Sequence, residues 1–235
     1  MSRPPDSGPQ VVIDFERGGR IGIEEAVLCS DKRPAQLEAI LERHAARGHP
    51  CLLTRLSPEL LASLGESRRD RLDYDPVSRT AFFLEPRPPA AEAVVAIVSG
   101  GSSDAPVCGE AARTLAFHGV ASTRIEDVGV AGLWRVMDRL EEIRRHAVVI
   151  AVAGMEGALF SVLGGLVRAP LIAVPTSVGY GVAAGGELGL RSALASCAPG
   201  IVAVNVDNGY GAACAALRML GLLGGPATGR DPAHG

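Results

Sequence analysis

The sequence has few of the features that mark membrane, secreted or nucleic-acid-binding proteins. Aromatic residues make up only 4% of its 235 residues, and no apolar run is long and uninterrupted enough to cross a bilayer. The net charge of −3 provides no basic surface of the kind that binds nucleic acid. The opening residues, MSRPPDSGPQ, are polar and lack the apolar core of a signal peptide. These absences predict a cytoplasmic globular protein with no nucleic-acid or membrane partner.

Cysteine is present but is not arranged for disulfides or for metal binding. The sequence contains no Cys-x-x-Cys pair and no zinc-ligand spacing. An odd, scattered set in a chain of this kind predicts free thiols, most of them acting as small buried hydrophobic side chains. The five are Cys29, Cys51, Cys108, Cys197 and Cys214.

The first third of the chain predicts a small α+β domain. Residues 36–47 carry apolar side chains at helical spacing and are followed by Gly48, so we expect an amphipathic helix that ends there. Residues 51–56 and 80–84 have the pattern of short strands, and a helix starts at Ser57-Pro58-Glu59.

A proline-rich linker at residues 85–89 indicates the boundary with a second, larger domain. We expect four segments: a disordered lead (1–10), the N-terminal α+β domain (11–87), a nucleotide-binding catalytic domain (88–223) and a disordered tail (224–235).

The second domain alternates apolar runs with helical segments. The runs are continuous, which is typical of parallel strands covered on both faces. The sequence therefore predicts an α/β fold with a doubly wound, mostly parallel five-stranded sheet. The expected strands are 94–98, 120–125, 147–152, 171–174 and 201–206, and the expected helices are 106–118, 131–146, 156–167, 186–196 and 210–223.

A small-residue loop between the first of these strands and its helix is the strongest functional signal. Ser99-Gly100-Gly101 leads into Ser102, Ser103 and Asp104, directly before a helix start at Pro106. Free N–H groups and the positive end of the helix dipole make such a loop a phosphate site. The loop is neither an ATPase P-loop nor a dehydrogenase fingerprint. The alternative is that Asp104 only caps the helix.

The other strand ends carry glycine and single polar residues that would converge on the same crevice. Gly154 and Glu156 follow the third strand, Thr176 and Ser177 the fourth, and Asp207 the fifth. Glu156 would bind a metal ion or transfer a proton. Alternatively, it would only complement the helix dipole. Asp207 would be a functional carboxylate or part of a turn.

Cys197 lies in Ser196-Cys197-Ala198-Pro199-Gly200, where a helix must end. A helix C-terminus does not lower the pKa of a thiol, so its position alone predicts inert packing.

The loop and the alternating pattern resemble the PurE family, which moves CO2 on an aminoimidazole ribonucleotide. The segments that would carry the histidines of that family lack them here: residues 127–132 are Asp-Val-Gly-Val-Ala-Gly, and Ala158 stands at the position of the catalytic histidine.

The sequence is more similar to the LarB family of PurE relatives over residues 11–223. The motifs are Arg17-x-x-Arg20-x-Gly22-x-x-Glu25 with Lys32, and then the segments at 99–104, 127–132, 153–158, 174–181, 196–200 and 205–211. It departs from the family pattern at Glu24, Trp134 and Phe160.

This resemblance implies an enzyme of nickel-pincer nucleotide synthesis for lactate racemase. The substrate would be nicotinic acid adenine dinucleotide, carboxylated at C5 of its pyridinium ring with CO2 or bicarbonate and then cleaved to AMP and a biscarboxylated mononucleotide. Cys197 would be a transient nucleophile, which reverses the inert interpretation, and Asp207 a base or ribose ligand.

The resemblance also implies the remaining roles. Mg²⁺ or a similar cation would be held by Glu156 and Asp104, with no organic cofactor, and Glu156 would serve the phosphoanhydride cleavage. A homo-oligomer, dimer-based and up to an octamer, is implied. The expected substrate-binding residues are Arg17, Arg20, Lys32, Ser102, Ser103, Asp104, Gly154, Thr176 and Ser177.

Two alternatives stay open at this point. One is a PurE-type carboxylase or mutase acting on aminoimidazole ribonucleotide. The other is a nucleotide-binding module without catalytic activity.

Overall fold

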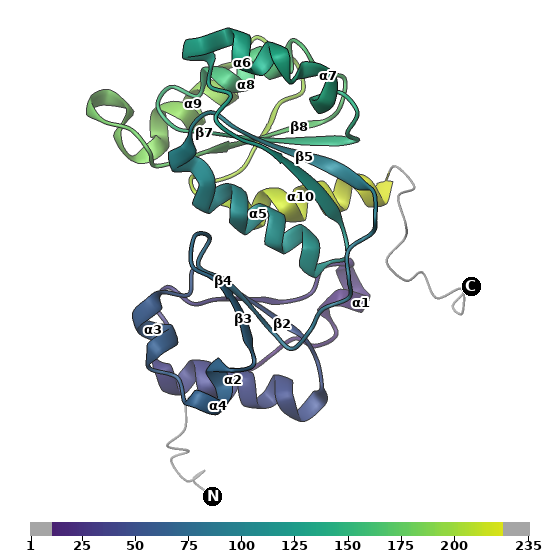
Figure 1. Cartoon of the computed structure of the whole chain (residues 1–235), viewed down its shortest axis with the longest axis vertical. Helices are drawn as coiled ribbons and strands as arrows, with labels where there is room; N and C mark the ends of the chain where they lie inside the picture. The colour runs from purple at the N-terminus through teal and green to yellow at the C-terminus, as the bar shows by residue number, and fades with distance from the viewer. Residues whose placement is uncertain (1–10, 223–235) are drawn as a thin grey trace, which may run out of the picture. The chain divides into compact units, whose positions relative to one another are not determined.

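The computed structural model describes residues 11–222, so the predicted disordered lead and tail lie outside the described residues. The chain divides into two compact units between Pro86 and Arg87 (Figure 1). Each unit contains a hydrophobic core of its own. Within residues 11–222, no helix combines the length and apolar character needed to span a membrane.

The N-terminal unit contains a four-stranded mixed sheet in the order β1-β2-β4-β3. β1 pairs with β2 in parallel, and the other two pairs are antiparallel. Its elements are α1 (Arg17–Ile21), β1 (Ala26–Leu28), α2 (Pro34–Arg47), β2 (Cys51–Thr54), α3 (Pro58–Ala62), α4 (Glu66–Arg69), β3 (Leu72–Asp75) and β4 (Thr80–Phe83).

Local sequence signals explain the helix ends of this unit. Pro34 stands at the start of α2, where a missing N–H costs nothing. Gly48 ends the helix in the left-handed region at φ 60°, which glycine adopts without strain. The Ser57 hydroxyl accepts a hydrogen bond from the Leu60 N–H at 3.2 Å at the start of α3. The predicted end of α2 at Gly48 and the predicted start of α3 at Ser57 are thus confirmed, whereas α2 begins two residues before the predicted start at Gln36.

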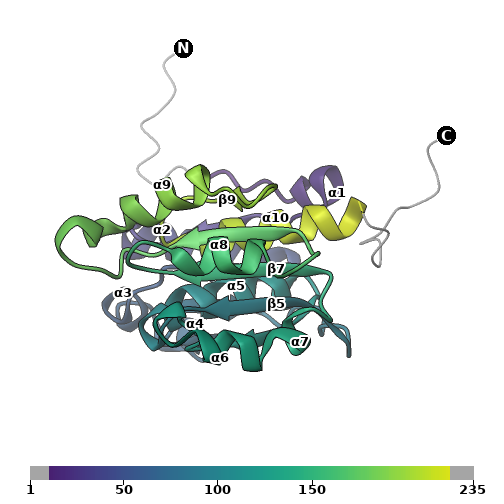
Figure 2. The same cartoon turned by 90° about the horizontal axis from the view of Figure 1, so that it is seen from above.

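The second unit contains a five-stranded sheet in the order β6-β5-β7-β8-β9, with every neighbouring pair parallel. Figure 2 shows β5, β7 and β9 following one another across this sheet. Its elements are β5 (Ala93–Ser99), η1 (Ser102–Asp104), α5 (Ala105–Phe117), β6 (Ala121–Ile125), η2 (Val130–Gly132), α6 (Leu133–Asp138), α7 (Leu140–Ile143), β7 (Val148–Ala153), α8 (Ala158–Gly164), β8 (Leu171–Pro175), η3 (Gly181–Gly186), α9 (Glu187–Ala195), β9 (Val202–Ala203) and α10 (Gly209–Leu222).

Helices cover both faces of this sheet, as the continuous apolar strands predict. Along β5, Val95 and Ile97 pack with α5 and α10, whereas Ala96 and Val98 pack with α6, α7, α8 and α9. The same two layers are visible in Figure 1. Because β5, β7 and β8 are buried on both sides, they carry no polar alternation. The predicted α/β, doubly wound architecture is confirmed.

Two predicted elements of this unit differ from the structure. The helix expected over 131–146 is interrupted at Arg139, whose φ of −102° and ψ of 0° separate α6 from α7. The strand expected over 201–206 is reduced to Val202–Ala203 at the sheet edge. Beyond it, only single hydrogen bonds tie Val204 and Asp207 to β8.

Candidate active site

The carboxyl ends of β5 and β7 form the switch point of the sheet. These strands are neighbours, but the chain leaves β5 for α5 on one face and β7 for α8 on the other. Loops that diverge in this way leave a crevice, where open α/β sheets bind their ligands. The Gly100 N–H donates to the Val152 carbonyl at 2.9 Å and so fixes the start of the loop against β7.

Asp104 holds this loop in place from inside the protein. The residue is only 3% exposed and accepts hydrogen bonds from the Gly101 N–H at 3.0 Å and from the Thr176 hydroxyl at 2.8 Å. Burial raises the pKa of Asp104; these two hydrogen bonds oppose that effect, and the nearby charge of Asp207 adds to it. The bond to Thr176 links the loops after β5 and β8.

Ser102 and Ser103 are exposed in the short turn η1. This turn runs directly into α5, a helix of 13 residues. The two hydroxyls therefore lie beside a helix N-terminus, where unbonded N–H groups and the helix dipole favour an anion. The arrangement is chemically suited to a phosphate group.

Gly154 allows the loops after β7 and β8 to touch. A Cβ at this position would lie 2.2 Å from the Val178 carbonyl oxygen and 3.0 Å from the Thr176 hydroxyl oxygen. The Met155 N–H donates to the same Val178 carbonyl at 2.8 Å. Gly154 and Thr176 are therefore neighbours, and the buried Thr176 acts on the site through Asp104.

Asp207 and Ser177 join the loops after β8 and β9. The Ser177 N–H donates to a carboxylate oxygen of Asp207 at 2.8 Å. Asp207 has a φ of 54°, and the same left-handed conformation occurs at Asp127 and Met155, which follow β6 and β7. Such conformations cost on the order of 1–3 kcal/mol and cluster at functional sites.

Glu156 is exposed at the same edge. It precedes Gly157, the N-cap of α8, so it lies just outside the helix that the sequence predicts it to begin. Its side chain is exposed to solvent, in contrast to the buried Asp104.

Sequence reasoning did not select two residues that shape this edge. The buried Ser99 accepts the Asp127 N–H on its hydroxyl at 3.3 Å and the Val128 N–H on its carbonyl at 2.9 Å. A Cβ on Gly129 would lie 2.4 Å from the Gly100 carbonyl oxygen, so the loop after β6 closely approaches the loop after β5. Asp127 lies two residues beyond the predicted strand 120–125, much as Asp207 lies directly beyond 201–206, so a position just past a strand could also have selected Asp127.

Cys197 does not join these residues, in contrast to the single site that the resemblance implies. Its helix α9 starts at the carboxyl edge, where Gly189 packs beside Pro175 at the end of β8. From Gly189 to Ala195, the last residue of α9, the chain advances about 9 Å along the helix axis, and Cys197 follows two residues later. Because a helix between parallel strands returns to their amino ends, the thiol is carried away from the crevice.

Contacts around Cys197 agree with this placement. The Ser196 hydroxyl lies 2.7 Å from that of Ser161, and Ala198 packs against Gly164 at the end of α8. The loop then enters β9, where Val202 pairs with Ile172 near the start of β8. Cys197 is exposed at this opposite edge.

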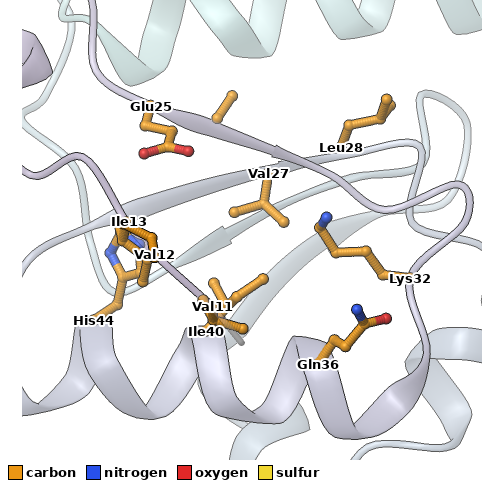
Figure 3. Close-up of a pocket in the computed structure, with 11 residues that line it drawn as sticks. Val11, Val12, Ile13, Glu25, Val27, Leu28, Lys32, Gln36, Ile40 and His44 are labelled. Atoms are coloured by element: carbon orange, nitrogen blue, oxygen red, sulfur yellow. The ribbon is translucent and has the colours of Figure 1, made fainter. Parts of the chain in front are cut away.

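The three predicted basic residues belong to the N-terminal unit. Arg20 forms an ion pair with Asp14 at 2.6 Å, and Arg17 begins α1. Lys32 lines a pocket within this unit together with Glu25 (Figure 3).

The described residues contain no group of three or more His, Cys, Asp or Glu side chains that could hold a metal ion. Both oxygens of Asp104 already accept hydrogen bonds. The carboxylates of the described residues therefore do not form a complete Mg²⁺ site by themselves. Mg²⁺ is commonly held by one or two carboxylates together with substrate phosphates.

The comparisons with known proteins match both units. Residues 94–225 match the family model of AIR carboxylase, and residues 7–85 match the model of the LarB/PurE-like N-terminal domain. An uncharacterized protein of Methanocaldococcus jannaschii is 46% identical over 120 residues, 50% of this chain and 46% of that protein. The chain therefore spans about half the length of that curated relative.

A solved structure of Treponema denticola PurE2, carrying one substitution, is 26% identical with a TM-score of 0.44, over 55% of this chain and 79% of that one. The AIR carboxylase model alone covers more than half of the chain, and the LarB-type model covers most of the remainder. The chain is thus a member of the LarB family of PurE-like, AIR-carboxylase-related proteins.

Proposed function

We propose that this protein is a cytoplasmic enzyme that carboxylates C5 of the pyridinium ring of nicotinic acid adenine dinucleotide. It then hydrolyses the phosphoanhydride to AMP and pyridinium-3,5-biscarboxylic acid mononucleotide, the first step of nickel-pincer nucleotide synthesis for lactate racemase. The observation that carries this proposal is the switch-point loop of a LarB-family chain. Ser102 and Ser103 are exposed in this loop, beside the N-terminus of α5. The buried Asp104 fixes the loop by accepting two hydrogen bonds.

The carboxylation needs a nucleophile because a pyridinium ring is electron-poor. The Cys197 thiolate adds to a ring carbon next to C5, and the ring becomes a dihydropyridine whose C5 has enamine character. C5 then bonds to CO2, a carboxylate such as Asp207 accepts the C5 proton, and the C–S bond breaks to return the thiolate and restore the aromatic ring. Covalent catalysis of this kind divides one difficult step into several easier ones.

The hydrolysis involves the other carboxylate of the crevice. The exposed Glu156 orients the water that attacks the phosphoanhydride. Mg²⁺ arriving with the dinucleotide would be held by Glu156 and the substrate phosphates, where it neutralises charge on the diphosphate.

The position of Cys197 adds a requirement to this mechanism. The thiol lies at the sheet edge opposite to Asp104, so a single chain cannot bring the two to one pyridinium nucleotide. The thiolate must therefore come from a second copy of the chain, which fits the homo-oligomer that the family resemblance implies. Each site is then incomplete without its neighbour.

The reaction is tested by mass spectrometry of the full-length protein with the dinucleotide, bicarbonate and Mg²⁺. Cys197→Ala should abolish the product, while the matched variant Cys214→Ala should retain it, since Cys214 lies in α10. Product formed equally by Cys197→Ala would refute the thiolate mechanism. EDTA should stop AMP release, because the proposed hydrolysis needs Mg²⁺ to neutralise charge on the diphosphate.

Shared sites are tested by mixing two inactive variants, Cys197→Ala and Glu156→Gln. Co-assembly at equal amounts should restore about a quarter of the wild-type activity, because random exchange gives one site in four an intact loop and an intact partner thiol. Absence of activity in verified mixed oligomers would show that both residues serve the same chain.

A PurE-type mutase is the second candidate, favoured by the match to AIR carboxylase. Its chemistry requires a histidine in the crevice. In the described part of the second unit, His118 ends α5 and His146 precedes β7, so both lie at the amino edge of the sheet. Turnover of aminoimidazole ribonucleotide would establish this candidate instead, and nucleotide binding without turnover in either assay would indicate a binding module.

A further inference from the structure

The N-terminal unit contains a pocket of about 330 Å³ whose lining residues carry none of the chemical steps proposed above. Its walls are β1, the helix α2 and the extended segment from Val11 to Ile13 (Figure 3). The volume lies at the lower end of the range for small-molecule sites. The pocket belongs entirely to this unit.

One end of the pocket is basic. Lys32 is half-buried, and within residues 11–222 its ammonium group takes part in no ion pair. Gln36, one turn into α2, uses its side-chain oxygen to accept the Arg33 N–H at 3.0 Å, so its NH2 group is left to donate. Figure 3 shows Lys32 and Gln36 at the same end. This end offers donors and a positive charge to an anion.

The other end is acidic and offers acceptors. Glu25 accepts the Asp14 N–H on one carboxylate oxygen at 2.6 Å, and within residues 11–222 its second oxygen accepts no hydrogen bond. The buried His44 places Nδ1 3.1 Å from the His49 carbonyl. A carbonyl only accepts, so Nδ1 carries the proton and Nε2 is an acceptor, which has no hydrogen-bond partner among the described residues.

Apolar side chains separate the two ends. Val27 and Ile40 lie between them in Figure 3. Gln36 and His44 are eight residues apart on one face of α2, so the ends are about 12 Å apart. Glu25 and Lys32 thus line one pocket without pairing with each other.

We propose that this pocket binds an elongated small zwitterion, with its carboxylate at Lys32 and Gln36 and its ammonium group at Glu25. A five-methylene chain spans roughly 7 Å, and a hydrogen bond of about 3 Å at each end covers the remaining distance. The methylenes pack against Val27 and Ile40. Opposite charges held apart across an apolar wall favour a molecule that carries both charges over one that carries either alone.

Three probes that differ by one charged group test this inference on the full chain. 6-Aminohexanoate carries both charges, hexanoate lacks the ammonium group and 1-aminohexane lacks the carboxylate. By calorimetric titration, we expect saturable binding of 6-aminohexanoate with a Kd of about 1 mM. Each truncated probe should bind at least about tenfold more weakly, since it loses a charge-assisted hydrogen bond.

Variants then identify the ends. Lys32→Met should weaken the binding of 6-aminohexanoate about tenfold and leave the binding of 1-aminohexane unchanged. Glu25→Gln should also weaken the binding of 6-aminohexanoate about tenfold, but leave the binding of hexanoate unchanged. Arg33→Met is the matched control, since it removes an adjacent exposed charge outside the pocket. No saturable binding, equal binding of the three probes, or equal effects of Lys32→Met and Arg33→Met would each overturn the inference.

Discussion

Replacing Asp104 tests the hydrogen bonds that hold the switch-point loop. Asp104→Ala removes the acceptor of two bonds and leaves the Gly101 N–H and the buried Thr176 hydroxyl without their partner. An unsatisfied buried group costs about 1–3 kcal/mol. Since Gly101 is only half-buried and water can reach part of it, we expect a total loss of about 2–4 kcal/mol in the free energy of unfolding.

Asp104→Asn should behave differently. Its amide oxygen can accept the Gly101 N–H while its NH2 group donates to the Thr176 hydroxyl, so both contacts persist and no charge is buried. We expect this variant to stay within about 1 kcal/mol of the wild type in the free energy of unfolding. The phosphate binding that we propose at Ser102 and Ser103 should then survive Asp104→Asn better than Asp104→Ala.

The pH dependence of the free energy of unfolding gives a second test of the role of Asp104. Burial raises the pKa of Asp104, so the folded protein keeps this proton to a higher pH than the unfolded chain. The stability contributed by Asp104 is therefore fully present below the unfolded pKa of about 3.9 and falls as the pH rises to the folded pKa. Relative to the wild type, Asp104→Asn should gain stability through this window and then level off.

Urea denaturation followed by the fluorescence of Trp134 measures both effects in the second unit, because Trp134 is the sole tryptophan of the sequence. A cycle with Thr176→Val should give a coupling energy of about 1 kcal/mol. Equal losses for Asp104→Ala and Asp104→Asn, or strictly additive effects with Thr176→Val, would refute the hydrogen-bond explanation.

Three further predictions concern packing, capping and thiol chemistry. Gly154→Ala places a Cβ 2.2 Å from a carbonyl oxygen and should cost about 1–3 kcal/mol in urea denaturation and reduce turnover, whereas the control Gly101→Ala, with its nearest contact at 3.8 Å, should be tolerated. Ser57→Ala removes the N-cap of α3 and should lower the free energy of unfolding of the N-terminal unit by about 1 kcal/mol, measured by circular dichroism; an unchanged midpoint would contradict the cap. Burial raises the pKa of Cys108 to about 12, so iodoacetamide at pH 7 should alkylate the exposed Cys197 first in peptide mapping, and equal labelling of both would contradict the burial of Cys108.

The sheet of the second unit was predictable because β5, β7 and β8 consist almost entirely of buried apolar residues, and a helix follows each of them. β6, with the sequence Ala-Ser-Thr-Arg-Ile, and the two-residue β9 carry a weaker signal. β3 was not predicted, since its sequence Leu-Asp-Tyr-Asp buries no residue fully and its pairing with β4 is a tertiary contact. β1 has only three residues within a charged stretch, which is too short for a periodic signal.

The loops of the site were predictable in position but not in their contacts. Parallel topology places Ser102, Glu156 and Asp207 at one edge. The hydrogen bond between Asp104 and Thr176 joins residues 72 positions apart, and one sequence contains no signal for it. The placement of Cys197 at the amino edge could have been predicted from the sequence, because the predicted helix before it must return the chain to that edge.

Exposed apolar side chains at the two edges favour contact between copies. Tyr180 and Val182, 78% and 93% exposed, follow β8 at the carboxyl edge beside the candidate site. Leu194, 71% exposed, lies three residues before Cys197 at the other edge. A head-to-tail contact that covers one region with the other would bring the thiol of one copy toward the loop of the next, and such a contact closes into a ring only when its rotation allows it. The mechanism proposed above needs the same contact, so we expect an isolated monomer to bind the dinucleotide without carboxylating it.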